Sequence, residues 1–308
     1  MKQRAALLWL IPVISLLALI AAGVGLFWQD GGPFMFTTVR GETVQMYGQG
    51  LYRYDSYFKA PILRGTDAVA LFAGLPLLAI AFRFYRRGSL RGGLLLVGAL
   101  SFFLYYSASL AFSAAFNRLF PVYVALFSAS FFAFLYALTA IDAPALDARL
   151  SPRLPRRGLA AFMFVAGLGV LFIWASELVG PALDGGTPAN LDADTTLFTH
   201  ALDIAVIAPA VILTGAALLR REPLGALLAA PLLVLCTLTG LVVIAQTVAQ
   251  TLAGITFPVG VYIGMIGSWV VMGAFAVGLA VAFFRGLAEP APAHSTPVAV
   301  AARPAGHA

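Results

Sequence analysis

Long runs of apolar residues recur along the whole chain and are separated by short clusters of charge. An α-helix needs about 20 such residues to cross the hydrocarbon of a bilayer. Because lipid offers no hydrogen bonds, the backbone groups of a span must be satisfied within the segment. Eight runs meet this condition, over residues 5–28, 66–84, 92–116, 119–141, 158–180, 197–219, 224–250 and 258–284. The predicted fold is therefore an all-α, polytopic transmembrane helical bundle.

The composition excludes several other classes of protein. With 61% hydrophobic and 10% charged residues, the chain is too apolar for a soluble domain. The net charge of +6 sits in arginine clusters between spans, which indicates a lipid bilayer rather than nucleic acid as the partner. Cys236 is the only cysteine, so no intramolecular disulfide can form. The only lysines are Lys2 and Lys59, and neither lies in the middle of a predicted span, which excludes a retinal Schiff base.

The positions of lysine and arginine predict the orientation. With the N-terminus inside, 14 of them face the cytoplasm and 5 the outside, as cytoplasmic loops require. The first apolar run is too long for a signal peptide and is expected to be retained. We therefore expect a multi-pass protein of an inner (plasma) membrane with both termini cytoplasmic. Residues 29–65 form an outer loop, and 287–308 are predicted to be a disordered cytoplasmic tail.

The chain also shows signs of an internal duplication. Asp67 near the start of the second span precedes the Arg86-Arg87 turn, and Asp203 early in the sixth precedes Arg220-Arg221. Pro76 and Pro209 interrupt the two helices at related depths. This pattern predicts two parallel four-helix repeats. Leucine-rich hairpins joined by arginine turns would give a similar pattern without duplication.

Polar side chains within spans are costly and usually face a bundle interior or a cavity. Here they all fall in the predicted outer half of the membrane. They suggest an outward-facing polar recess, covered by the tyrosine-rich outer loop. The candidate ligand-binding residues are Asp67, Tyr105, Glu177, His200, Asp203 and Gln246.

Each candidate also has a simpler interpretation. Asp67 follows Gly65-Thr66 at an expected helix start, where a carboxylate satisfies free amide groups. Gln246 and Gln250 share one helix face and could hold helices together. One histidine among dispersed carboxylates predicts no metal site, and no cofactor motif is present. The acidic outer loop with Asp184, Asp192 and Asp194 is expected to be solvated.

Four stretches resemble a group of uncharacterised bacterial multi-span membrane proteins. They are Tyr47-Gly48-Gln49-Gly50-Leu51-Tyr52, Gly65-Thr66-Asp67, Arg86-Arg87-Gly88-Ser89-Leu90-Arg91-Gly92, and the segment from Thr195-Thr196 to Leu202-Asp203. The resemblance covers most of the chain, from the first loop to the seventh helix. It implies a bacterial inner-membrane location and no particular activity.

Three functions remain open on this evidence. The favoured one is binding or transport of a small molecule or lipid through the recess, with protonation of Asp203 or His200 coupled to movement of one half. The second is an intramembrane enzyme that uses Glu177, His200 and Asp203 on a lipid-linked substrate. The third is a non-catalytic sensor or assembly subunit. Because no residue pattern identifies a reaction, a non-enzymatic role is favoured.

Overall fold

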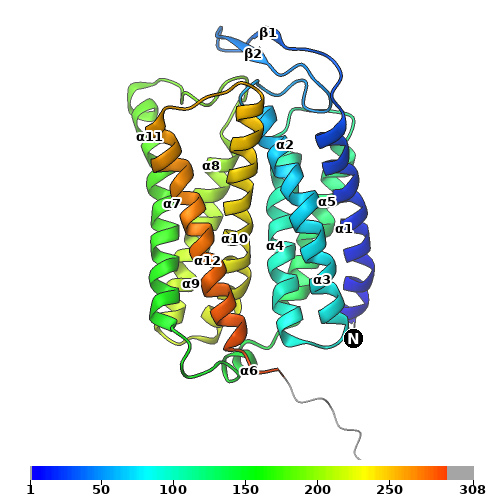
Figure 1. Ribbon diagram of the computed structural model, residues 1–308, viewed down its shortest axis with the longest axis vertical. Coiled ribbons are helices and arrows are strands. Elements are labelled where there is room, and N and C mark those ends of the chain that lie inside the picture. Colours follow the sequence, from blue (N-terminus) through cyan, green and yellow to red (C-terminus); the bar gives the residue numbers. More distant parts are fainter. Residues whose placement is uncertain (1, 290–308) are drawn as a thin grey trace, which may run out of the picture.

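The structure is a computed structural model that describes residues 2–289. Residues 290–308, which hold most of the predicted tail, lie outside the described residues. Within the described part, eight helices are long and apolar enough to cross a membrane. They are Gln3–Phe27, Lys59–Arg86, Leu90–Phe112, Phe120–Thr139, Arg156–Asp184, Phe198–Leu219, Pro223–Leu252 and Val259–Arg285. The predicted all-α bundle is therefore confirmed, with eight spans (Figure 1).

Three of the spans contain a π-helical turn, and a two-stranded hairpin precedes the second span. The elements are α1 (Lys2–Phe27), β1 (Phe34–Thr37), β2 (Thr43–Met46), α2 (Lys59–Val69), η1 (Ala70–Gly74), α3 (Leu75–Arg86), α4 (Leu90–Phe112), α5 (Phe120–Thr139), α6 (Ala143–Asp147), α7 (Arg156–Asp184), α8 (Phe198–Leu202), η2 (Asp203–Ile207), α9 (Ala208–Leu219), α10 (Pro223–Leu252), α11 (Val259–Val261), η3 (Tyr262–Ile266) and α12 (Gly267–Arg285).

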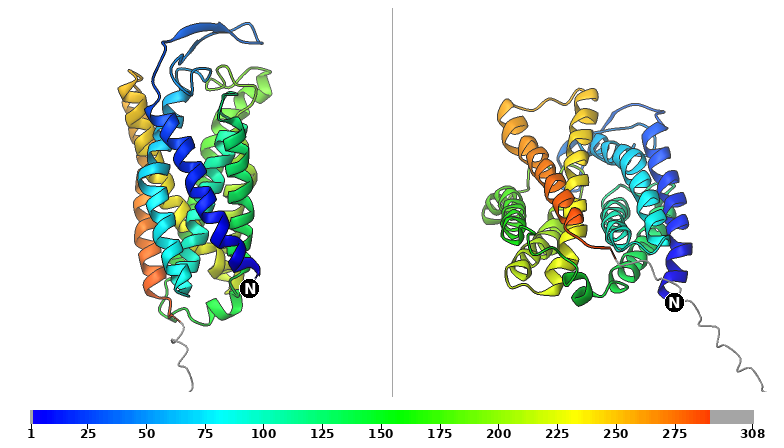
Figure 2. Two further views of the ribbon diagram at one scale, coloured as in Figure 1. Left: turned by 90° about the vertical axis from the view of Figure 1, so that its right-hand side faces the viewer. Right: turned by 60° about the horizontal axis from the view of Figure 1, so that its bottom comes forward.

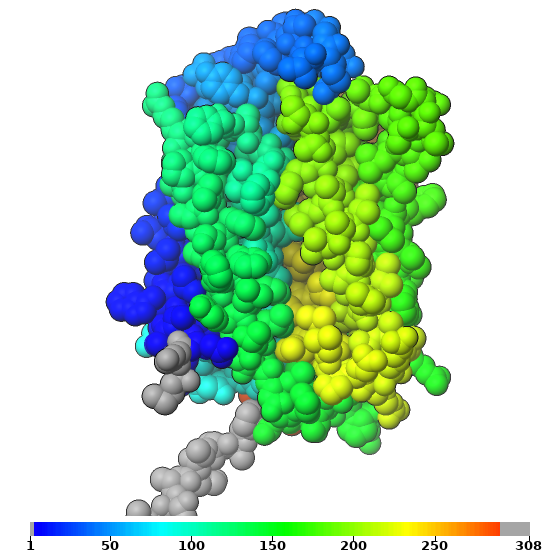
Figure 3. Space-filling view, turned by 180° about the vertical axis from the view of Figure 1, so that it is seen from behind, coloured from blue at the N-terminus to red at the C-terminus, as the bar shows by residue number. Residues whose placement is uncertain are grey.

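The bundle has two distinct ends. We call the end that carries β1 and β2 the loop end, and the end that carries the N-terminus the terminal end (Figure 1). Strands β1 and β2 are antiparallel, and their loop lies over the loop end of the bundle (Figure 3). Helices α1–α5 form one half and α7–α12 the other (Figure 2). Helix α10 joins the halves because it packs against both α2 and α4.

The second span begins earlier than the sequence predicts, at Lys59 instead of residue 66. The two basic residues of this first stretch suggest a loop, but both have hydrogen-bond partners within the protein. The ammonium group of Lys59 lies 2.8 Å from Asp194, and the Arg64 guanidinium donates to the Tyr47 hydroxyl at 2.9 Å. With these partners, the polar stretch can continue the helix.

The two halves share several local features at one common spacing. Ala70 and Asp203, where η1 and η2 begin, are 133 positions apart (203 − 70), as are Pro76 and Pro209 (209 − 76). Each proline follows its π turn, where the missing amide donor leaves a carbonyl without its usual partner. These matches support the predicted repeat. They also correct its register, because Asp67 then corresponds to His200 and not to Asp203.

The turns at the terminal end repeat in the same register. A Cβ atom on Gly92 would lie 2.7 Å from the backbone of both Phe84 and Tyr85. A Cβ on Gly225 would lie 2.7 Å from the carbonyl carbon of Ala217 and 2.6 Å from the amide nitrogen of Leu218. Both glycines therefore permit the same close approach of one helix start to the preceding helix end.

The first residues of the predicted disordered tail are ordered, which contradicts the predicted boundary. Leu287 forms a bridge with Leu150, and the carboxylate of Glu289 accepts hydrogen bonds from the Leu90 and Arg91 amides. Burial alone would raise the pKa of Glu289, but the hydrogen bond from the Ser89 hydroxyl and those from the two amides lower it on balance. The free amide groups at a helix start attract a carboxylate, and this interaction is not visible in composition.

Candidate functional site

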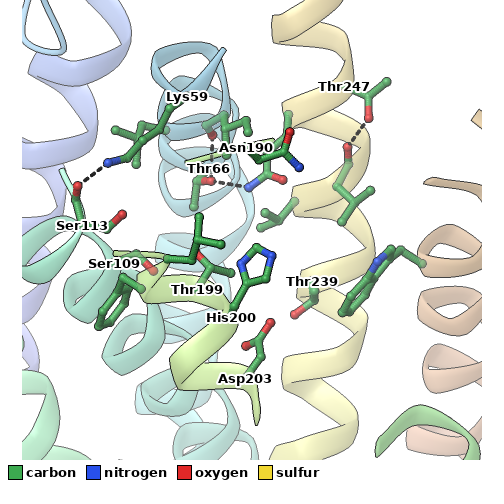
Figure 4. A pocket seen from close by; sticks show the side chains of 18 of the residues that line it. Lys59, Thr66, Ser109, Ser113, Asn190, Thr199, His200, Asp203, Thr239 and Thr247 are labelled. Carbon is green, nitrogen blue, oxygen red and sulfur yellow. Dashed lines mark hydrogen bonds between the residues drawn. The ribbon is translucent and has the colours of Figure 1, made fainter. Parts of the chain in front are cut away.

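A cavity of about 480 Å³ lies toward the loop end, between the two halves. Its walls come from α2, α4, α7, α8, α10 and the segment from α11 to α12, and Figure 4 shows part of its lining. The structure brings five of the six predicted residues to this cavity, namely Tyr105, Glu177, His200, Asp203 and Gln246. The sixth, Asp67, does not line it. Five of the six polar side chains predicted for the site thus converge on a single space.

Asp203 lies at the point where the two halves meet. One carboxylate oxygen accepts a hydrogen bond from the Tyr105 hydroxyl of α4 at 3.0 Å. The other accepts one from the indole nitrogen of Trp174 of α7 at 2.9 Å. Only 5% of Asp203 is exposed, and no basic side chain among the described residues forms a salt bridge with it. Asp203 is therefore an acid held by two neutral donors at the cavity wall.

His200 and Glu177 form a second polar pair beside Asp203. The Nε2 atom of His200 lies 2.9 Å from a Glu177 carboxylate oxygen, and the Trp174 ring lies 4.0 Å from the imidazole ring. A carboxylate can only accept, so Nε2 donates and the neutral ring keeps its lone pair on Nδ1. That Nδ1 atom is buried without a hydrogen-bond partner in the described part of the chain. The pair could act as an oriented base or as an acceptor for a ligand.

Asp67 is fully buried behind the cavity wall. Its two carboxylate oxygens accept hydrogen bonds of 2.7 Å from the hydroxyls of Tyr52 and Tyr106. Burial, and then the charge of Asp67, raises the pKa of Tyr52 well above its usual value, so this tyrosine keeps its proton. The interpretation of Asp67 as a helix cap is wrong, because the helix begins at Lys59 and Asp67 lies more than two turns within it. Its predicted part in ligand binding stays a prediction.

Glycine is required beside this carboxylate. A Cβ atom on Gly25 of α1 would lie 2.0 Å from an Asp67 oxygen and 2.8 Å from the Tyr52 hydroxyl. Any side chain there would displace one of the two groups. Helix α1, the outer loop, α2 and α4 therefore all meet at Asp67.

The glutamines of α10 connect that helix to α2. The Gln246 side chain donates to the Thr66 hydroxyl at 2.9 Å, and Gln250 donates to the Phe58 carbonyl at 3.3 Å. A Cβ on Gly65 would lie 2.5 Å from the Gln246 backbone, so the two helices are in close contact at this point. The interpretation of these glutamines as links between helices is confirmed. Gln246 also faces the cavity.

An ionic cluster at the mouth of the cavity escaped sequence reasoning. The ammonium group of Lys59 lies 2.8 Å from Asp194 and 3.2 Å from Asp55, and it also donates to the Ser113 carbonyl. Ser56 donates to Asp192 at 2.8 Å. The prediction that the acidic loop is solvated is therefore wrong for Asp192 and Asp194, because both carboxylates have partners within the protein. Lys59 and Asp194 are 135 positions apart in the sequence, and the loop between α7 and α8 brings Asp194 to Lys59.

Within residues 2–289, no three histidine, cysteine or acidic side chains lie close enough together to hold a metal ion. No protein-family model, no curated protein and no solved structure matches this chain. Its function must therefore be argued from the cavity itself.

Replacing either tyrosine that binds Asp67 should destabilise the protein. Tyr52→Phe or Tyr106→Phe removes one donor from a buried carboxylate, at a cost of about 1–3 kcal/mol each. The double variant should lose at least the sum of the two single losses in unfolding free energy, because it leaves the carboxylate without either hydroxyl. The measurement is the thermal unfolding midpoint in detergent micelles. Tyr54→Phe is the control, since Tyr54 is 55% exposed, and equal effects at Tyr52 and Tyr54 would refute this account.

The pH dependence of stability should report on Asp55. Burial raises the pKa of this carboxyl from 3.8 to about 6, against the opposing effects of Lys59 and the Ala115 amide. Because the folded pKa is the higher one, Asp55 contributes stability that is fully present below pH ~4 and lost as the pH rises through ~6, on the order of 2–3 kcal/mol.

Asp55→Asn should accordingly reduce the loss of thermal stability between these two pH values. Asp184→Asn, at an exposed acid of the same end, should leave the profile unchanged. If Asp55→Asn leaves the pH dependence of thermal stability unchanged, the assignment of this dependence to Asp55 is wrong.

Proposed function

We propose that this integral membrane protein binds a small ligand in the cavity at the loop end and serves in its transport. The observation that carries the proposal is the double hydrogen bonding of Asp203. Its donors, Tyr105 and Trp174, belong to different halves of the bundle. A ligand that competes for Asp203 would therefore change the contact between the halves. Transporters built from repeats commonly bind their substrates at such an interface.

The lining of the cavity favours a ligand with a cationic or hydrogen-bond-donating group. Asp203 and Glu177 supply acceptors, whereas the ammonium group of Lys59 is already held by Asp55 and Asp194. Lys59 is the only lysine or arginine that lines the cavity among the described residues. The rest of the wall is largely apolar and aromatic, which suits an apolar body on the ligand.

For the membrane and the orientation, we propose a bacterial inner membrane with both termini in the cytoplasm. The distribution of lysine and arginine supports this orientation. The loop end, and with it the cavity, would then lie on the extracytoplasmic side.

Binding of a small amine tests the proposal. n-Hexylamine should raise the thermal unfolding midpoint of the protein in micelles more than n-hexanoate does, because a ligand that binds only the folded state stabilises it. Asp203→Asn keeps the shape of the side chain and removes its charge. This variant should weaken hexylamine binding about ten- to a hundred-fold, as expected for a lost charged hydrogen bond.

Asp184→Asn is the matched control, because Asp184 is an exposed acid at the same end and does not line the cavity. It should bind hexylamine like the wild type. If hexylamine and hexanoate stabilise the wild type equally, or if both variants respond alike, the proposed site is wrong.

A second candidate function is hydrolysis of a lipid-linked substrate, and one observation favours it. The Glu177 carboxylate orients His200 so that the buried Nδ1 lone pair has no protein partner, which is the arrangement of a general base. His200→Gln would remove the base and keep a side chain of similar reach. Under this hypothesis it abolishes turnover of a lipid ester substrate, whereas Thr247→Val, at a cavity residue whose hydroxyl donates to the Val243 carbonyl of its own helix, retains it. Turnover by the His200→Gln variant at the wild-type rate would eliminate the enzyme hypothesis.

A further inference from the structure

Two helices of the second half separate from the bundle toward the loop end. All buried residues of α7 lie between Leu159 and Gly167, and none follows up to its end at Asp184. In the last span, α11 and η3 contain no buried residue, and the first one in α12 is Gly273. No residue in the loop-end halves of these two spans is therefore fully buried, although Trp174 and Glu177 of α7 contact Asp203 and His200.

The first half is closed at the corresponding place. Helix α1 packs against both α2 and α5, and its buried residues run from Leu7 to Gly25. Helix α7 packs extensively against α9 but makes no extensive contact with α12. The right-hand view of Figure 2 shows α7 and α12 apart from each other. The first and last spans of the second half thus lack the mutual packing of α1 and α5, and we call the space between α7 and α12 the gap.

The cavity reaches this gap. Its lining includes Trp174 and Glu177 from α7, and Met265 and Trp269 from the last span. Of the two donors that hold Asp203, Trp174 belongs to α7 and Tyr105 to α4, while the last span contributes mainly apolar side chains. Both spans are long and apolar enough to cross a membrane, so in a bilayer the gap would face the hydrocarbon.

Side-chain contacts bridge neighbouring segments at the loop end of the cavity. The Tyr57 hydroxyl donates to the Ala253 carbonyl at 2.6 Å, and the ring of Phe58 lies 6.2 Å from that of Phe257. The Lys59–Asp194 ion pair closes the opposite edge. A molecule from water would pass these contacts to reach the cavity, whereas a molecule in the bilayer would enter through the gap.

We infer that the ligand is a membrane-dissolved amphiphile that reaches the cavity between α7 and α12. This inference rests on the proposed binding function and names its ligand class. The amine or other donor group of the head occupies the space beside Asp203 and Glu177, and the acyl chain lies between Met265 and Trp269 and extends into the bilayer. A volume of about 480 Å³ suits a head group with the first part of a chain.

A photo-crosslinking amino acid at the lip of the gap tests the inference. Met265 is 36% exposed and lines the cavity, so benzoylphenylalanine replaces it in one variant. Val13 of α1 is 44% exposed on the closed half and carries the same probe as the control. Both proteins are placed in phosphatidylcholine nanodiscs doped with dodecylamine, irradiated, and analysed by intact-protein mass spectrometry.

The expected result is several-fold more dodecylamine adduct at position 265 than at position 13, and loss of this excess when Asp203→Asn is added. Equal labelling at the two positions would overturn lateral access, as would a protein–protein adduct at position 265, because a second copy would then cover the gap. The two proposals fail separately. Equal labelling together with Asp203-dependent binding of hexylamine refutes the lateral route alone, whereas loss of both refutes the binding site itself.

Discussion

The arrangement of the first half depends on one carboxylate that has no contact with water. Asp67 receives the Tyr52 hydroxyl from the outer loop and the Tyr106 hydroxyl from α4, and Gly25 of α1 leaves room for both. A buried acid is tolerated only when its oxygens are hydrogen-bonded, so all four segments must be in place together. Tyr106 and the neighbouring Thr66 also line the cavity. The same interaction that closes the first half therefore fixes one wall of the candidate site.

Comparison of the two halves suggests how the cavity arose. In the common register, Asp67 corresponds to His200, and Tyr106 corresponds to Thr239. The first half fills this place with an acid and a tyrosine ring, whereas the second has a histidine and a much smaller hydroxyl side chain. Both His200 and Thr239 face the cavity (Figure 4). A threonine in the place of a tyrosine ring leaves space between the packed helices, and α7 and α12 do not pack against each other beside it.

The sequence predicts the parts of this structure that depend on single segments. Span number follows from helix length and apolar content, and the convergence of Tyr105, Glu177, His200, Asp203 and Gln246 follows from their common depth. Partners distant in the chain could not be predicted in this way. The sequence predicts Lys59 and Asp194 as solvated loop charges, because it does not show that the fold brings them together. It favours a helix cap for Asp67, because the tyrosines that bind this carboxylate belong to other segments of the chain. Composition places Glu289 in a disordered tail, because it does not reveal the hydrogen bond between this carboxylate and the first residues of α4.

The bilayer also determines which part of a ligand can provide selectivity. An acyl chain that moves from lipid to the apolar lining exchanges one hydrocarbon environment for another, so it gains little free energy. The head group gains more, because acceptors at this depth cannot be satisfied by water. Asp203 and the Glu177–His200 pair are the acceptors on the cavity wall next to the gap, and Lys59 is neutralised by two aspartates. Discrimination among amphiphiles should therefore follow the donors of the head group and not the length of the chain.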